Sequence, residues 1–166
     1  KLKISNMSPP EMIVAFVKGD IDAFFAWEPH IHNAQRQLPD ARIFGAEGLY
    51  QGWAAVNMDP EFVKANPETT RKVIRALLKS EAYVRSHKDE CVKLVAARLK
   101  MDESVLRLLW NETTFKVELD KSLVSEMKDI GGWVLEMNKS DKPLPNFREY
   151  MDEKALRAER PKSVSL

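Results

Sequence analysis

The sequence predicts an α/β protein in which a small parallel sheet is followed by a helix-rich remainder. Over residues 1–57, short apolar runs alternate with segments of helical pattern, in the order strand, helix, strand, helix, strand. From residue 59 to about residue 138, apolar side chains instead recur at the spacing of amphipathic helices. Strands that alternate with helices form parallel sheets with right-handed crossovers, so we expect the first part to build such a sheet.

Four short segments are the candidate strands. Residues 2–6 alternate apolar and polar side chains, as a half-buried strand does, and residues 21–26 are apolar at all but one position, as in a buried parallel strand. Residues 41–44 follow a Pro-Asp turn, and residues 50–57 begin between two glycines. The pattern changes after these strands, so the best candidate for a domain boundary lies near Asn57.

Capping residues mark the helices of the first part. Ser8, Pro9 and Glu11 have the pattern of a capping box with proline at the first helical position, and Gly19 predicts the end of that helix. A second short helix is expected to begin after the strand at residues 21–26 and to end at about residue 37.

Capping residues also mark the helices of the second part. N-cap residues followed by apolar stripes predict helix starts at Asn66, Ser86, Asp102 and Asp120, and a short helix is expected over residues 149–158. The clearest stripe follows Asp120 and consists of Leu123, Met127, Ile130, Val134 and Met137. So few strands cannot cover so many helices, which predicts that the chain is part of a larger protein. The alternative is that the helices pack on one another as a small bundle.

The composition argues against several classes of partner. Lysine and arginine total 26 against 25 acidic residues, a formal net charge of +1, so no charge bias favours nucleic acid or an anionic membrane surface. The longest apolar runs are too short to cross a bilayer. Cys91 is the only cysteine, so no intrachain disulfide can form.

Trp27, Glu28 and Pro29 are the first candidate ligand-binding residues. They follow the strand predicted at residues 21–26, and ligands of open α/β sheets bind at the carboxyl ends of strands. An indole offers a flat apolar face, and a carboxylate accepts hydrogen bonds from amines or hydroxyls. Trp53 is a candidate second aromatic wall. The alternative is that both tryptophans pack in the core and that Glu28 only favours a helix N-terminus.

Neither a metal site nor a catalytic site is predicted. Glu28, His30 and His32 spell Glu-x-His-x-His, but residues two apart do not share a helix face, and no fourth ligand is evident. Cys91 lies in an amphipathic helix among charged neighbours, with only His87 four residues earlier as a weak partner. The sequence has no glycine-rich phosphate loop and no nucleophile elbow. We therefore expect no catalytic residue, no metal and no cofactor.

Three segments resemble the nitrate, sulfonate and taurine family of ABC-importer binding proteins, to which the thiamine-pyrimidine binding proteins are related. The first is Lys-Gly-Asp-Ile-Asp-Ala-Phe-Phe-Ala-Trp-Glu-Pro-His at residues 18–30, similar to the family's Gly-x-(Val/Ile)-Asp-Ala…Trp-(Glu/Asp)-Pro stretch. The others are Pro-Glu-Phe-Val-Lys-Ala-Asn-Pro-Glu at residues 60–68 and Glu-Arg-Pro-Lys-Ser-Val at residues 159–164. Their order along the chain matches that of the family.

The resemblance implies an incomplete type-two periplasmic-binding-protein fold, which has two α/β lobes joined by a hinge. Residues 1–51 would belong to the second lobe, residues 52–57 would cross the hinge, and residues 58–166 would return to the first lobe. Trp27 and Glu28 match positions that face the ligand cleft of relatives. The family's N-terminal half is missing from this sequence, and that half of the same protein would be needed to complete the cleft.

The resemblance also implies the function: capture of a small polar organic molecule or oxyanion, of the sulfonate, nitrate or pyrimidine class, for an ABC-importer permease. The location would be periplasmic or extracellular, with membrane association through the transporter. Glu28 favours a ligand with an amine or ring donor over a bare oxyanion. Two alternatives remain open: an enzyme of the same fold, of the desulfinase or pyrimidine-synthesis type, and a stand-alone helical interaction module.

Overall fold

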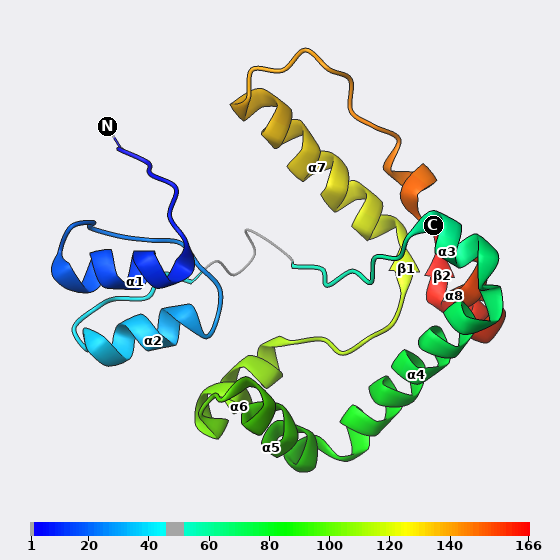
Figure 1. Ribbon diagram of the computed structural model, residues 1–166, viewed down its shortest axis with the longest axis horizontal. Helices are drawn as coiled ribbons and strands as arrows, with labels where there is room; N and C mark the ends of the chain where they lie inside the picture. The colour runs from blue at the N-terminus through cyan, green and yellow to red at the C-terminus, as the bar shows by residue number, and fades with distance from the viewer. Residues whose placement is uncertain (1, 46–51) are drawn as a thin grey trace.

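Helices make up most of the regular structure of this computed structural model, which describes residues 2–45 and 52–166. They form an open arc in which α1 and α2 lie at one side, α3 to α6 follow along the other, and α7 stands apart (Figure 1). In chain order the helices are α1 Pro9–Lys18, α2 His30–Gln37, α3 Pro60–Ala65, α4 Pro67–Ser86, α5 Lys88–Leu99, α6 Glu103–Glu112, α7 Lys121–Met137 and α8 Lys154–Glu159. Two short 3₁₀ helices, η1 Phe147–Tyr150 and η2 Pro161–Ser163, flank α8.

The predicted capping residues begin and end the helices where expected. The Glu11 carboxylate accepts hydrogen bonds from the backbone N–H and the hydroxyl of Ser8, at 2.9 and 2.6 Å, and these bonds lower the pKa of Glu11. Gly19 ends α1 in the left-handed conformation at φ 78°. Asp102 and Asp120 each accept a bond from the backbone two residues on, at 2.7 and 2.8 Å. Local sequence therefore fixes these boundaries.

Two other helix predictions were met only in part. The predicted start at Ser86 lies close to the observed N-cap of α5, which is His87. The terminal helix expected over residues 149–158 is divided into η1 and α8, with an irregular stretch between them.

The only sheet in the described part of the chain is a two-stranded parallel pair that includes none of the predicted strands. Strand β1, Leu119–Asp120, pairs with β2, Val164–Ser165. Leu119 lies opposite Val164, and Asp120 lies opposite Ser165. This pair joins the start of α7 to the segment that follows η2.

The parallel sheet expected in the first part is not formed among the described residues. Residues 2–6, 21–26, 41–44 and 52–57 are irregular, and none of them forms a ladder with another described segment. Residues 50 and 51 of the last candidate lie outside the described residues. An apolar run can become a strand only where a partner strand meets its backbone N–H and C=O groups. The type-two periplasmic-binding fold and its domain limits, which fall within residues 46–57, stay predictions.

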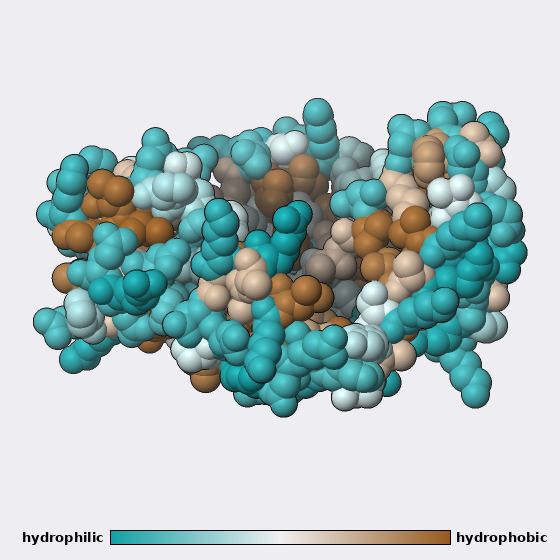
Figure 2. All heavy atoms as spheres, turned by 60° about the horizontal axis from the view of Figure 1, so that its bottom comes forward, coloured by the Kyte–Doolittle hydropathy of each residue, from teal (hydrophilic) through white to brown (hydrophobic). Residues whose placement is uncertain are grey.

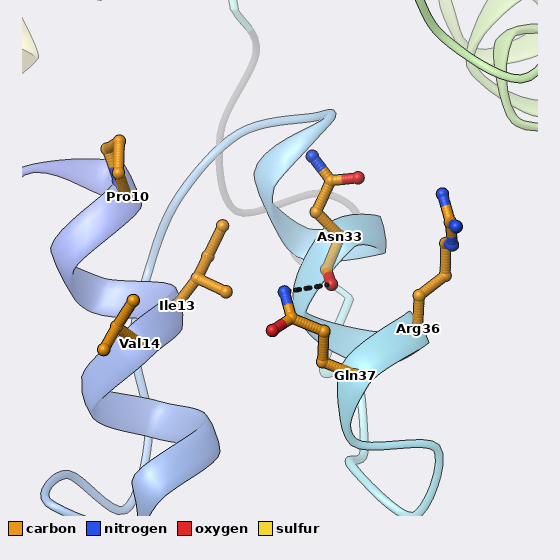
Figure 3. A pocket seen from close by; sticks show the side chains of 6 residues that line it. All are labelled: Pro10, Ile13, Val14, Asn33, Arg36 and Gln37. Carbon is orange, nitrogen blue, oxygen red and sulfur yellow. Dashed lines mark hydrogen bonds between the residues drawn. The ribbon is translucent and has the colours of Figure 1, made fainter.

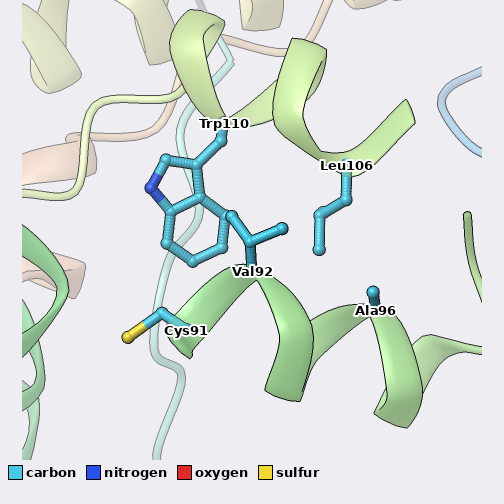
Figure 4. Packing of buried hydrophobic residues seen from close by; sticks show 5 residues of the cluster. All are labelled: Cys91, Val92, Ala96, Leu106 and Trp110. Atoms are coloured by element: carbon cyan, nitrogen blue, oxygen red, sulfur yellow. The ribbon is translucent and has the colours of Figure 1, made fainter. Parts of the chain in front are cut away.

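The hydrophobic core of the structure lies between α5 and α6. Val92 is completely buried, and Cys91, Ala96, Leu106 and Trp110 surround it (Figure 4). Four partly buried side chains pack on this cluster: Val84, Val95, Met101 and Phe115. Helices α5 and α6 follow each other in the chain and form a hairpin. The buried cluster between them stabilises this hairpin without contributions from distant segments.

Ion pairs attach the C-terminal segment to α4. Glu81 is 5% exposed, and its carboxylate accepts bonds from Arg160 at 2.6 and 3.1 Å, from Arg85 at 2.7 Å and from the backbone N–H of Val117 at 2.9 Å. The bonds from Arg160, followed by the other donors, outweigh burial and lower the pKa of Glu81. Arg160, which follows α8, bonds to this carboxylate of α4, and the bonds hold the two segments side by side.

Many large apolar side chains remain exposed outside this core. Phe25 and Phe44 are 83% and 88% exposed, and Trp133 and Met137 on α7 are each 60% exposed. Figure 2 shows hydrophobic side chains at the surface of one face, some of them around a hollow in the middle. Exposed apolar surface on this scale is typical of segments that contact another part of a protein or a partner. None of the described helices is both long enough and apolar enough to cross a membrane.

Candidate ligand-binding site

The helical pair α1–α2 presents the predicted binding residues. The two helices pack against each other, with Ile13 of α1 and Ala34 of α2 buried between them and Phe16 edge-to-face with Phe24 at 5.1 Å. Ala26 is also buried and holds the connecting segment against the pair. The chain then enters α2 through a cis peptide bond before Pro29, the N-cap residue of α2. Trp27 and Glu28 therefore stand at the N-terminal end of α2.

Trp27 lies on the surface rather than in the core. Its side chain is 66% exposed, and its ring meets the His30 ring edge-to-face with 5.8 Å between centroids. The interpretation of Trp27 as a residue that closes the core of this chain is therefore wrong. An exposed indole held by a neighbouring ring can offer its apolar face to another molecule.

Glu28 is half-buried and has a structural role at the N-terminus of α2. One of its carboxylate oxygens, Oε2, accepts a hydrogen bond from the backbone N–H of His32 at 3.1 Å. This contact satisfies an otherwise unpaired helix N–H and places negative charge at the positive end of the helix dipole. The bond uses one of the two carboxylate oxygens, so the role as a cap does not exclude a ligand contact.

Trp53 is not brought into an aromatic cluster with Trp27. It is half-buried in an irregular segment, and it joins none of the aromatic ring pairs found in the described residues. Of the four predicted site residues, the structure thus brings together the contiguous three, Trp27, Glu28 and Pro29. The assignment of all four to a ligand site stays a prediction.

A groove between α1 and α2 adds residues that sequence reasoning missed. It has a volume of about 450 Å³, with Pro10, Ile13 and Val14 on one side and Asn33, Arg36 and Gln37 on the other. Figure 3 shows these side chains on facing helices, with Gln37 donating to the backbone of Asn33 at 3.2 Å. The signal was present in the sequence, because positions 33, 36 and 37 share one polar face of a helix.

Charged side chains of α2 act on Asp102, the N-cap residue of α6. The pKa of Asp102 is lowered chiefly by the Ser104 hydrogen bonds, with smaller contributions from the charges of His32 and Arg36.

The remaining chemical candidates do not form a reactive site in the structure. No group of three His, Cys, Asp or Glu side chains able to hold a metal ion occurs among residues 2–45 and 52–166. Cys91 is buried in the α5–α6 core. His87 stacks on Tyr83 with 4.0 Å between ring centroids, and its Nδ1 lies 2.8 Å from the Ser86 hydroxyl. This arrangement directs His87 to its own helix end rather than to the cysteine.

The chain is similar to proteins named as binding proteins. One from Brucella abortus (strain 2308) is 22% identical over 164 residues, which cover 90% of this chain and 50% of the relative. One from Brucella suis biovar 1 (strain 1330) matches to the same extent. The taurine-binding periplasmic protein of Escherichia coli (strain K12) is 27% identical over 85 residues, 48% of this chain and 24% of the relative.

These similarities support the general class of binding proteins but do not assign the chain to a particular family. No family model matches the chain, and no solved structure matches it. The chain spans about half the length of the Brucella relatives that it matches. The names of the relatives are those of binding proteins rather than of enzymes, and one of them is periplasmic.

Proposed function

We propose that this chain is the C-terminal part of a two-lobed solute-binding protein that captures a small molecule in the periplasm and delivers it to an ABC-importer permease. The observation that carries the proposal is the similarity to binding proteins of twice the length, which extends over 90% of the chain. In this proposal the missing N-terminal half supplies the partner strands and the opposite wall of the cleft.

The exposed apolar segments support a larger assembly. Residues 2–6, 21–26 and 41–44 have the patterns of strands, yet they have no partner strands among the described residues. Phe25 and Phe44 lie in or beside these segments with most of their surface in contact with water. Pairing with strands of the missing half would satisfy both the backbone groups and the apolar side chains.

Trp27 and Glu28 form one wall of the proposed cleft. The exposed indole provides an apolar face, and the Glu28 carboxylate provides a negative charge beside it. A bare oxyanion would be repelled by Glu28, whereas an amine or a ring N–H would donate to it. The proposed ligand is therefore a small polar organic molecule with an amine or a ring donor, such as a zwitterionic aminosulfonate.

The first test is the intact mass and N-terminal sequence of the natural protein from its source cell. The proposal expects a longer mature chain with a lobe preceding Lys1. If the natural product begins at Lys1, a two-lobed trap is excluded, and the helical interaction module becomes the better explanation of the exposed apolar face of α7.

The second test is ligand binding by the natural protein, measured by calorimetry with taurine, nitrate, an alkanesulfonate and an aminopyrimidine. Trp27→Ala should weaken binding of the preferred ligand on the order of tenfold or more. Trp133→Ala is the matched control, because Trp133 on α7 is similarly exposed, at 60% against 66%. Equal affinity in both variants would remove Trp27 from the site.

An enzyme of the same fold is the competing proposal from a different class. It would require a reactive group, and the one cysteine, Cys91, is buried in the core between α5 and α6. Thiol labelling of the natural protein with and without ligand separates the two. Ligand turnover together with ligand-dependent protection of Cys91 would favour the enzyme over the binding protein.

A further inference from the structure

A second pocket, remote in sequence from Trp27 and Glu28, lies at the junction of three helices. It is formed where α4 ends, α5 begins and the chain leaves α6, and its volume is about 340 Å³. That volume is at the lower end of the range for small-molecule sites. No residue of this pocket belongs to the predicted cleft.

Two aromatic rings give the pocket an apolar wall. Trp110 and Phe115 lie with their ring centroids 4.6 Å apart and their planes tilted by 39°. Trp110 is only 9% exposed because it also packs on Val92, so its ring is fixed by the core (Figure 4). In the same view its nitrogen lies at the end of the ring away from Leu106. A rigid aromatic wall can hold a flat apolar group at low entropic cost.

Three cationic side chains line the same pocket, and no carboxylate does. They are Arg85 from α4, Lys88 from α5 and Lys116 from the segment after α6. Thr113 and Thr114 add hydroxyl groups to the lining. A protein with a formal net charge of only +1 therefore gathers three positive charges around one aromatic hollow. Lysine and arginine side chains are the usual partners of carboxylate and sulfonate groups.

The neighbouring carboxylates do not neutralise this charge completely. Glu81 pairs with Arg85, but it also pairs with Arg160, so two cations share one carboxylate. Lys116 forms an ion pair with Glu118. The ammonium of Lys88 donates to the neutral amide oxygen of Asn111 at 2.6 Å. An excess of positive charge therefore remains at the pocket, and an anion there would gain favourable Coulomb energy.

We propose that this pocket is a second binding site, which takes a small organic anion consisting of a carboxylate or sulfonate on a flat apolar body. The anionic group contacts Lys88, Lys116 and Arg85. The apolar body lies on Trp110 and Phe115. The site is independent of the proposed solute cleft, because it is built from α4, α5, α6 and the segment that follows α6.

The test is a titration of the ¹⁵N-labelled protein with benzoate and benzenesulfonate, followed by amide chemical shifts. Both anions should move the signals of residues 84–88 and 110–116 with saturation. Benzyl alcohol is the neutral control for the ring, and sodium sulfate at equal ionic strength is the control for the charge. Both controls should move these signals much less. Benzyl alcohol can contact only the aromatic rings of the pocket, and sulfate can contact only its cationic side chains.

Variants separate the pocket from general electrostatic attraction. Lys88→Gln combined with Lys116→Gln should raise the Kd for benzoate about tenfold or more. The matched control is Lys64→Gln with Lys72→Gln, which removes the same charge from exposed positions on α3 and the first part of α4. A well-dispersed spectrum of each variant establishes that it is folded. The proposal is overturned if both double variants bind alike, if sulfate alone reproduces the shifts, or if neither aryl anion shifts these signals.

Discussion

The helical region from α4 to α6 and the N-terminal region before α3 differ in where their apolar side chains lie. In the first, Val92 is fully buried and Trp110 is 9% exposed, so two adjacent helices form their own core. In the second, Leu2, Phe25 and Phe44 are 91%, 83% and 88% exposed. The difference shows that two consecutive helices can bury their apolar side chains against each other. A segment with a strand pattern can bury its apolar side chains only when it pairs with segments that are distant in the sequence.

The largest expected effect comes from the core of the helical region. Trp110→Ala should lower the free energy of unfolding of the α5–α6 hairpin by about 3–5 kcal/mol, because it removes a buried indole and leaves a cavity. Urea denaturation followed by hydrogen exchange of α5 amides measures this loss. Leu108→Ala on the same helix, where the side chain is 66% exposed, should change stability by less than about 0.5 kcal/mol. Equal losses in the two variants would mean that this core does not dominate stability.

Glu81 should have the next largest effect. Glu81→Gln removes the charge that two arginines share, and it leaves Arg160 partly buried beside a neutral amide. The expected loss is about 3 kcal/mol, the lower end for a broken buried ion pair, because Arg160 is itself about one-third exposed. Glu68→Gln is the control, since Glu68 pairs with Arg71 at the surface and should cost less than about 0.5 kcal/mol. Thermal unfolding of both variants tests the difference.

Acid should weaken the same ion pair. The pKa of Glu81 is lowered in the folded chain, chiefly by Arg160, so folding favours its ionised form. The resulting stability is fully present above the unfolded pKa of about 4.3 and is lost as the pH falls through the folded value. Unfolding measured from pH 7 to pH 2 should show this loss in the wild type and a weaker dependence in Glu81→Gln. Identical pH profiles would show that Glu81 contributes no linkage.

Two glycines provide a matched pair of smaller effects. A Cβ added at Gly19 or at Gly132 would meet no atom within 4 Å, so only the backbone conformation distinguishes them. Gly19→Ala should destabilise the end of α1 by about 1 kcal/mol, because φ is +78° there. Gly132→Ala, inside α7, should stabilise its helix by up to about 1 kcal/mol. Helicity and amide protection in each helix give the sign, and equal signs would contradict this interpretation.

The smallest expected effect sharpens the comparison most. Phe25→Ser should change the stability of this chain by less than about 0.5 kcal/mol, because the side chain is 83% exposed. In the longer, two-lobed protein that we propose, the same substitution should cost about 2 kcal/mol or more if the segment becomes a buried strand. Parallel denaturation of both forms measures this. A small effect in both forms would remove residues 21–26 from any sheet.

Helix boundaries could be predicted from sequence because capping is local. Ser8, Gly19, Asp102 and Asp120 each act within a few residues of their own position, and the structure confirms all four. The predicted strands have no partner strands among the described residues, because strand pairing depends on segments far away in the sequence. The β1–β2 pair escaped prediction for the same reason, since two residues at each side give no periodic signal.

The candidate site was predictable in part. Trp27 and Glu28 could be selected by type and position, but the hydrogen bond from His32 to Glu28 could be assigned only with the helix in view. The groove residue Arg36 and the pocket residue Lys88 were missed. Each lines a hollow only because residues of another helix form the opposite side of it. Sites between elements require the packing, which the order of residues does not provide.

The bonds of Arg160 to Glu81 span 79 positions of the chain, and β1 meets β2 across 45, from Leu119 to Val164. During synthesis α4, α5 and α6 emerge long before Arg160 does. The α5–α6 hairpin can therefore form early from nearby contacts, while the carboxylate of Glu81 must wait for the second of its two arginines, Arg160. Completion of this region is a late event of translation, and a ribosome paused before residue 160 would hold a chain with a folded hairpin in which Glu81 is paired with Arg85 but not yet with Arg160.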